Sequence, residues 1–279
     1  MTRYGSRIRR ATTPLLLIGA LGATATACSI STQQEVQMGR QYAAQINAQL
    51  PIVEDRSVNQ YMNALGQQLA RQGDRNLQYY FYVVNTDVVN AFAVPGGFVY
   101  VNRGLIEETD NLSELAGVLA HEISHVELRH SAEQMERAQS ANLGLNLAYI
   151  LLGRPPSGVE QAAIQVGGTA FFARYGREAE LEADAEAVEL TVQSGINPNG
   201  MVTFFKELLA ERERRPSQLE RWFSTHPLTE ERITRIRQLI ERYPARQISN
   251  LSVNTQAYEN FKAQLARYPA PPPEYRAGR

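Results

Sequence analysis

The sequence has one cysteine, Cys28, and only four histidines among its 279 residues. A lone cysteine excludes an internal disulfide. The formal net charge is -1, which gives no electrostatic reason to expect a nucleic-acid partner. With 43% hydrophobic and 20% charged residues, the composition is that of a globular protein with one sizeable core or two small ones.

The mature chain also lacks a hydrophobic run long enough to span a membrane. A short apolar run, PLLLIGALGATATA (14–27), follows four arginines and is typical of a secretory signal over residues 1–27. Because Cys28 comes next, the arrangement resembles a bacterial lipoprotein signal, which implies lipidation of Cys28. Residues 28–34 are then the lipidated N-terminus and a polar tether. Simple cleavage after residue 27 is the alternative, and both predict export.

Two segments predict strands. LQYYFYVVN (77–85) is aromatic and β-branched, and residues 88–106 contain two extended pieces joined at Pro95-Gly96-Gly97. Proline cannot donate to a strand ladder, so this part of the sheet is expected to be an edge or a bulge. The remaining periodicity is helical, with Asn111 and Thr229 as expected N-caps. The helices are predicted over 35–71 (broken at Pro51), 111–138, 159–173, 175–194, 198–213, 217–223, 229–243 and 253–267.

The pattern therefore predicts an α+β fold, mostly helical, with one domain over residues 35–268. No helical repeat of fixed length is visible. The proline-rich tail, 269–279, is expected to be disordered.

Three of the four histidines lie in LAHEISHVELRH (119–130), which contains the motif H-E-x-x-H at His121, Glu122 and His125. Positions i and i+4 of a helix share one face, so both imidazoles can bind one metal ion. Glu122 then lies beside the metal, where a water would sit. The alternative is a buried helix with two hydrogen-bonded histidines. The motif alone favours a metal but does not identify the reaction.

A third protein ligand has to come from elsewhere. His130 is nine residues after the first motif histidine, so on a continuous helix it faces away and is expected to be a surface or second-layer residue. The acidic segment 175–188 is the better source, although a solvated acidic face is the ordinary interpretation of such a stretch. Glu180 and Asp184 form an i, i+4 pair, so one can bind the metal while the other hydrogen-bonds a ligand histidine. Glu182 lies off that face.

Together these motifs resemble one metallopeptidase family. The H-E-x-x-H motif followed by Arg177-x-x-Glu180-x-x-Ala183-Asp184 is similar to the HtpX/CAAX-protease-type gluzincins, and most similar to their exported BepA/LoiP branch of bacterial envelope metallopeptidases. NAFAVPGG (90–97) resembles the strand before the active helix of that family, and STHPLTEERI (224–233) resembles its Thr-His-Pro segment near the metal. The resemblance covers about residues 35–245 and implies a zincin-like core whose edge strand flanks the H-E-x-x-H helix.

The resemblance implies one zinc ion per chain with His121, His125 and Glu180 as ligands. Glu122 is then the general base for water, and Asp184 supports a ligand histidine. His226 has two interpretations: it stabilises the tetrahedral oxyanion, or its loop occupies the open zinc position and silences the enzyme. A third interpretation is a capping histidine before a proline.

The expected function is a zinc endopeptidase that hydrolyses misfolded or misassembled envelope proteins in the periplasm, anchored to the outer membrane by its lipid. Substrate is expected to add as a strand along the sheet edge. A non-catalytic, zinc-bound chaperone or assembly factor is the alternative. The residues expected to bind substrate are Asn90, Ala91, Phe92, Ala93, Gly96 and Gly97.

Overall fold

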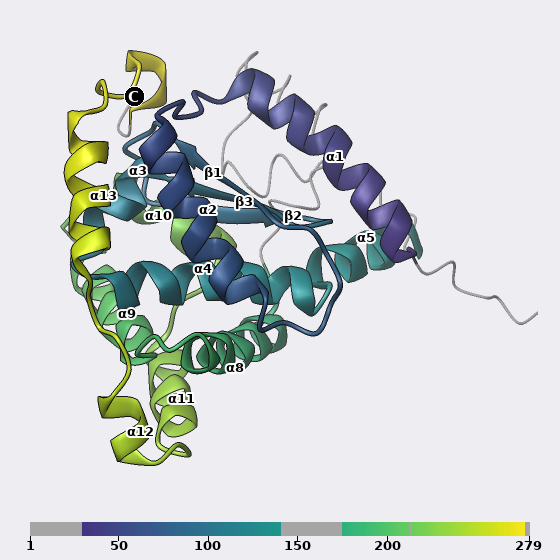
Figure 1. The fold of residues 1–279 in the computed structure, drawn as a ribbon. Coiled ribbons are helices and arrows are strands. Elements are labelled where there is room, and N and C mark those ends of the chain that lie inside the picture. Colours follow the sequence, from purple (N-terminus) through teal and green to yellow (C-terminus); the bar gives the residue numbers. More distant parts are fainter. Residues whose placement is uncertain (1–29, 141–174, 213, 277–279) are drawn as a thin grey trace, which may run out of the picture.

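The computed structural model describes residues 30–140, 175–212 and 214–276 (Figure 1). It confirms an α+β architecture that is mostly helical around one small sheet. None of the helices in these ranges combines the length and apolar character needed to cross a membrane. The elements are α1 (Thr32–Gln49), α2 (Arg56–Ala70), β1 (Tyr80–Val84), β2 (Ala91–Val94), β3 (Phe98–Asn102), α3 (Arg103–Glu108), α4 (Leu112–Glu127), α5 (His130–Ser140), α8 (Arg177–Gln193), α9 (Asn199–Glu211), α10 (Pro216–Thr225), α11 (Glu230–Ile240), α12 (Ala245–Ser249), α13 (Gln256–Arg267) and the 3₁₀ helix η1 (Pro273–Tyr275).

The sheet has the order β1-β3-β2, with β1 parallel and β2 antiparallel to β3. β2 and β3 form a hairpin across the predicted Pro95-Gly96-Gly97 turn. Gly96 and Gly97 have φ of 81° and 94°, a region that L-residues with a side chain rarely adopt. Because β2 is last in the strand order, it lies at an edge of the sheet in the described part of the chain, as predicted from the proline.

The two faces of the sheet carry different side chains because successive residues of a strand point to opposite sides. The face toward α1 is aromatic, and its rings stack in three pairs: Tyr80 on Phe98, Tyr82 on Tyr100, and Phe92 on Tyr100. The face toward α2 and α4 is aliphatic except for Phe81 of β1, and β2 contributes only Ala91 and Ala93 to it. These small side chains let α4 pack closely against the edge strand.

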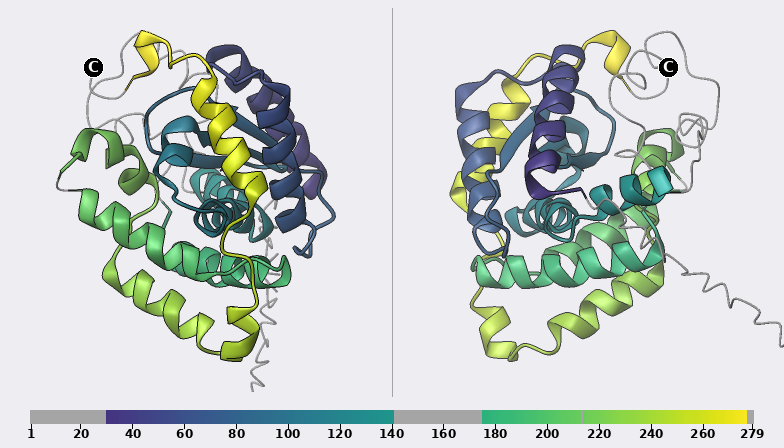
Figure 2. Two further views of the ribbon diagram at one scale, coloured as in Figure 1. Left: turned by 60° about the vertical axis from the view of Figure 1, so that its left-hand side comes forward. Right: turned by 90° about the vertical axis from the view of Figure 1, so that its right-hand side faces the viewer.

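The α4 helix occupies the centre of the molecule, between the sheet and a layer formed by α8 and α9 (Figures 1 and 2). All sixteen of its residues are buried, so it has no solvated face. On the far side of α8 and α9 lies α11. The helix that carries the H-E-x-x-H motif is thus enclosed by core packing on all sides.

The predicted helix over 111–138 is wrong in one respect: it is two helices. α4 ends at Glu127, and α5 starts again at His130 after Arg129, which has φ of 60°. A left-handed residue ends a helix in the way a C-terminal glycine does. Arginine carries no such signal, and here the conformation is held by an ion pair with Glu35 and a hydrogen bond to the Ile30 carbonyl.

Residues 31–34 and 269–276, predicted as tether and disordered tail, are ordered in the structure. Ser31 caps α1, so the helix begins at Thr32, inside the predicted tether. Residues 269–276 of the predicted disordered tail pack against the domain, because Arg103 and Asn85 donate hydrogen bonds to the carbonyl of Pro269. Residues 103–108 form α3 although an extended segment was predicted through 106, and the short helix α12 was not predicted. The helix predicted over 159–173 lies outside the described residues.

Close packing of α9 against α4 depends on Gly200. A Cβ atom there would lie 2.2 Å from the carbonyl carbon of Ser113, so Gly200→Ala has to push the two helices apart. We expect it to lower the free energy of unfolding by about 1–3 kcal/mol, measured by urea denaturation. Asn199→Ala, at the exposed neighbouring position, is the matched control and should change stability by less than about 0.5 kcal/mol. Equal stability of both variants would contradict this packing.

Candidate metal centre

His121 and His125 project from one face of α4. The N-cap of this helix is Asn111, as predicted, and its side chain accepts a hydrogen bond from the backbone N–H of Glu114. Ten residues later the two histidines lie one turn apart, both fully buried, with their Nε2 atoms separated by 3.1 Å. The local spacing of the motif therefore brings two ring nitrogens to one point inside the core.

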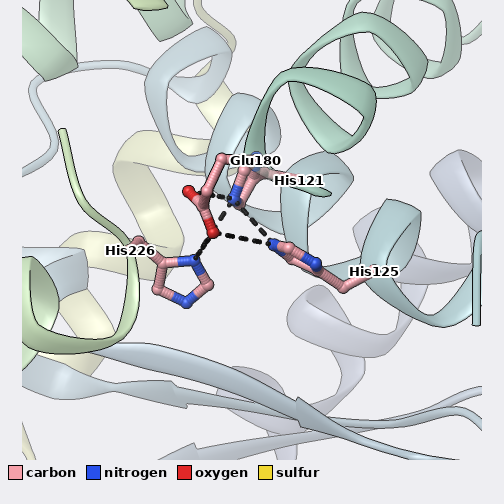
Figure 3. Close-up of side chains that lie close together, drawn as sticks. All are labelled: His121, His125, Glu180 and His226. Carbon is pink, nitrogen blue, oxygen red and sulfur yellow. Dashed lines mark hydrogen bonds and ion pairs between the residues drawn. The ribbon is translucent and has the colours of Figure 1, made fainter. Parts of the chain in front are cut away.

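Glu180 and His226 reach the same point from other elements. Glu180 lies in the first turn of α8, and His226 is the residue that follows α10. Figure 3 shows the four side chains converging. The Nδ1 atom of His226 lies 3.2 Å from Oε1 of Glu180 and 3.3 Å from Nε2 of His121. The same Oε1 atom lies 3.5 Å from Nε2 of His125.

These separations have a chemical meaning. Zinc in a tetrahedral site keeps its ligand atoms about 2.0–2.1 Å away, which puts neighbouring ligand atoms about 3.3 Å apart. Four of the six pairs among these donor atoms are 3.1–3.5 Å apart. One ligand atom from each of the four residues lies within 4.8 Å of every other. Two imidazoles, a carboxylate and a further imidazole thus form a set that fits an ion of this size.

Asp184 and Arg232 lie behind these donors. Oδ1 of Asp184 is 3.1 Å from Nδ1 of His121, on the side of the ring that faces away from the cluster. Arg232 donates two hydrogen bonds to Asp184, at 2.8 and 2.7 Å, and a third to Oε2 of Glu180. A forked guanidinium pairing of this kind fixes both carboxylates in position.

The charges of the site are unbalanced without a cation. Glu122, Glu180 and Asp184 are three buried carboxylates, and among the described residues Arg232 is the guanidinium buried with them. When all are ionised and the histidines are neutral, the net charge is minus two, which a divalent ion neutralises. Burial opposes ionisation of Glu180, but His226 and Arg232 nevertheless hold its pKa well below the usual range.

The surroundings of His125 keep its imidazole neutral. Burial lowers the pKa of His125 well below its usual value, which keeps the imidazole neutral. Metal ligation requires a neutral ring nitrogen, so this environment favours a ligand. For His226 burial acts in the same direction, but the carboxylates of Glu122 and Glu180 outweigh it and raise the pKa.

Comparison with known proteins places this arrangement in a family. The sequence model of Peptidase family M48 matches residues 55–240, a range that contains all four donor residues. The chain belongs to peptidase family M48. This confirms the metallopeptidase family indicated by the motifs.

Among its M48 relatives, the "Beta-barrel assembly-enhancing protease" of Escherichia coli (strain K12) is 35% identical over 219 residues, which cover 75% of this chain and 44% of the relative. The "Metalloprotease LoiP" of the same strain is 32% identical over 177 residues, covering 63% and 66%. A "Putative beta-barrel assembly-enhancing protease" of Vibrio cholerae is 32% identical over 228 residues, covering 79% and 47%. The chain spans less than half the length of the first and third relatives.

The sequence motifs did not identify Arg232 as part of the site. A signal for it exists in the helical periodicity: Arg232, Ile236 and Ile240 recur every four residues on the buried face of α11. An arginine on an otherwise apolar face requires a buried partner, but periodicity cannot name that partner. Thr229, predicted as the N-cap, does cap this helix.

Glu122 is buried beside the four donors. Neither of its oxygens has a hydrogen-bond partner among the described residues, and Oε1 lies 3.4 Å from Nε2 of His226. Burial raises the pKa of Glu122. A buried carboxylate that accepts no hydrogen bond is costly, so its position beside the donor cluster favours a chemical role over a structural one.

His130 does not face away as a continuous helix would require, and of its two predicted positions, at the surface or in a second layer, the structure agrees with the second. Because α4 ends before it and α5 begins with it, His130 turns back into the core, where its Nδ1 atom lies 2.8 Å from Nδ1 of His125. Its Nε2 atom lies 3.2 Å from Oε2 of Glu182. Glu182 itself is mostly exposed and does not belong to the donor cluster, consistent with its predicted position off that face.

The residues predicted to bind substrate are distributed over both faces of the hairpin. Ala91 and Ala93 belong to the aliphatic core on the α4 side, and Phe92 belongs to the aromatic stack on the α1 side. All of them are buried, as is Asn90, so only the strand backbone is suited to recognise a peptide. Gly97 packs against the backbone of Gln78, and Gly96 packs against that of α1.

Removing the buried guanidinium should unfold this centre. Arg232→Met leaves Glu180 and Asp184 without their counter-charge, so we expect a loss of about 3–5 kcal/mol in the free energy of unfolding of the metal-free protein. Arg235→Met changes an exposed arginine of the same helix and should have little effect. Urea denaturation of the two variants measures the difference. A loss of similar size in both would show that Arg232 stabilises the site no more than a surface charge.

Proposed function

We propose that this chain is a zinc-dependent endopeptidase. The observation that carries the proposal is the combination of four buried donors at zinc-like spacing with the buried carboxylate of Glu122, which accepts no hydrogen bond from the described residues, beside them. A purely structural zinc site has no use for a free base. Membership of peptidase family M48 supports the same reaction.

The roles follow from position. His121, His125 and Glu180 are the proposed zinc ligands, and Asp184 orients His121 through its Nδ1 atom. Bound zinc would supply Lewis acidity and lower the pKa of water to about 7. Glu122 accepts the proton of the attacking water and passes it to the leaving amine, which the raised pKa of a buried carboxyl group favours.

His226 is proposed as the group that closes the site. Its Nδ1 atom is as close to His121 and Glu180 as the ligand atoms are to one another, which is the geometry of a fourth ligand. A group that only stabilised the oxyanion would need to lie farther from the other donors, because the substrate oxygen has to fit between it and the metal. The loop after α10 would therefore have to move before substrate enters.

The proposed substrates are unfolded or misassembled proteins of the cell envelope. The edge strand β2 packs on α4, so an extended peptide that added to its backbone would pass next to the donor cluster. Backbone pairing carries little sequence preference, as suits unfolded chains. The relatives named beta-barrel assembly-enhancing proteases are consistent with such targets.

The proposed location is the periplasm, with a lipid on Cys28 that anchors the chain to the outer membrane. This rests on the N-terminal signal in the sequence, because residues 1–29 lie outside the described ranges. The alternative function is a zinc-bound assembly factor for outer-membrane proteins that acts by binding alone. The burial of Glu122 without a hydrogen bond from the described residues favours the peptidase.

The peptidase is tested with Glu122→Gln and Glu180→Gln. We expect Glu122→Gln to keep its zinc and lose casein cleavage by at least about 100-fold, because a general base contributes that much. Glu180→Gln should lose zinc as well as activity. Zinc content by elemental analysis and cleavage of casein measure the two effects. Equal cleavage by Glu122→Gln and the unmodified protein would refute the peptidase mechanism, and undiminished zinc in Glu180→Gln would move the third ligand elsewhere.

The role of His226 is tested separately. If it blocks the fourth position, His226→Ala should cleave casein faster than the unmodified protein at saturating zinc. If it stabilises the oxyanion instead, the same variant should lose about 100-fold or more in kcat. Steady-state rates for both proteins distinguish the two roles.

A further inference from the structure

The two proposed histidine ligands are supported in different ways. His121 has a carboxylate behind it, Asp184, which is buried and pinned by Arg232. His125 has another histidine: Nδ1 of His130 lies 2.8 Å from Nδ1 of His125, and the two ring centres are 4.9 Å apart. His130 is 3% exposed, so this contact is shielded from solvent.

The chemistry of this contact fixes the protons. His125 directs Nε2 toward the donor cluster, 3.1 Å from Nε2 of His121, so its lone proton belongs on Nδ1. Its Nδ1–H can then donate to Nδ1 of His130, which must be the unprotonated nitrogen of that ring. The proton of His130 is thereby placed on Nε2, which lies 3.2 Å from the carboxylate of Glu182. His130 then accepts one hydrogen bond and donates one, while His125 donates one and keeps the lone pair of Nε2 for the metal.

The break between α4 and α5 puts His130 in this position. On a continuous helix His130 would lie across from His121, but the left-handed Arg129 redirects the chain. Arg129 is bound to the carbonyl of Ile30 and to the buried carboxylate of Glu35. The start of the described chain therefore holds the turn that aims His130 at His125.

We propose that His130 and Glu182 are positioning residues that form a relay behind His125, fixing its tautomer and ring orientation and strengthening it as a ligand. The relay does for His125 what Asp184 does for His121, but it ends at a side chain that is 62% exposed. Mutation of a residue that hydrogen-bonds a ligand histidine typically lowers metal affinity or activity by about 10–100-fold. The inference rests on the zinc centre proposed above.

The experiment measures the zinc dissociation constant of the purified protein by competition with a chromophoric chelator. His130→Phe keeps a buried ring but removes the acceptor, and we expect zinc binding about 10–100-fold weaker. His130→Asn places an oxygen where Nδ1 stood, so it should recover most of the lost affinity. Glu182→Ala should weaken binding by a smaller factor, and Glu178→Ala, exposed one turn earlier on α8, should not change it.

The outcomes separate the relay from the metal centre. If the unmodified protein binds zinc and His130→Phe binds it equally well, with an unchanged melting temperature of the metal-free form, the relay is refuted and the centre stands. If His130→Asn is as weak as His130→Phe, acceptance of the His125 proton is not what matters, and the relay is refuted again. If the unmodified protein binds no zinc, both proposals fail.

If His130→Phe does not fold, Glu182→Ala decides, because the side chain of Glu182 is at the surface. Zinc affinity equal to that of Glu178→Ala overturns the relay, and weaker binding supports it.

Discussion

The pairing of Arg232 with Asp184 and Glu180 is the interaction on which the rest of the centre depends. Carboxylates are almost never fully buried unless paired, because removing their charge from water costs several kcal/mol each. Arg232 satisfies two of them at once, through a fork on Asp184 and a single bond to Glu180. Asp184 is thereby free to face His121, and Glu180 keeps an oxygen toward the cluster.

Arg232 alone does not neutralise the buried carboxylates of this centre. With Glu122 also buried nearby, the ionised carboxylates outnumber the guanidinium by two. A folded protein can offset that surplus with a divalent cation, by protonating a carboxyl group, or by protonating His226, whose pKa these carboxylates raise. The second route is visible in the direction of the Glu122 pKa, and the first agrees with ring nitrogens and a carboxylate oxygen spaced as in a tetrahedral site.

Packing around α4 brings these groups together. Its neighbours approach closely because they present small residues: Ala91 and Ala93 from the edge strand, and Gly200 from α9. The helix is consequently buried on every side, and its polar residues have to find partners inside the protein. His121 and His125 do so in the donor cluster, and the hydroxyl of Ser124 does so on the carbonyl of Ala120.

The sequence by itself determined what lies within one helical turn and what the motifs share with a family. The i, i+4 spacing placed His121 with His125 and Glu180 with Asp184, and the caps at Asn111 and Thr229 were readable because capping is local. Only the tertiary structure decided which oxygen meets which ring, that Arg232 holds both carboxylates, and that His130 turns inward. Those features depend on packing between elements far apart in the chain, and on a left-handed arginine whose conformation is held by residues about a hundred positions away, which no local pattern records.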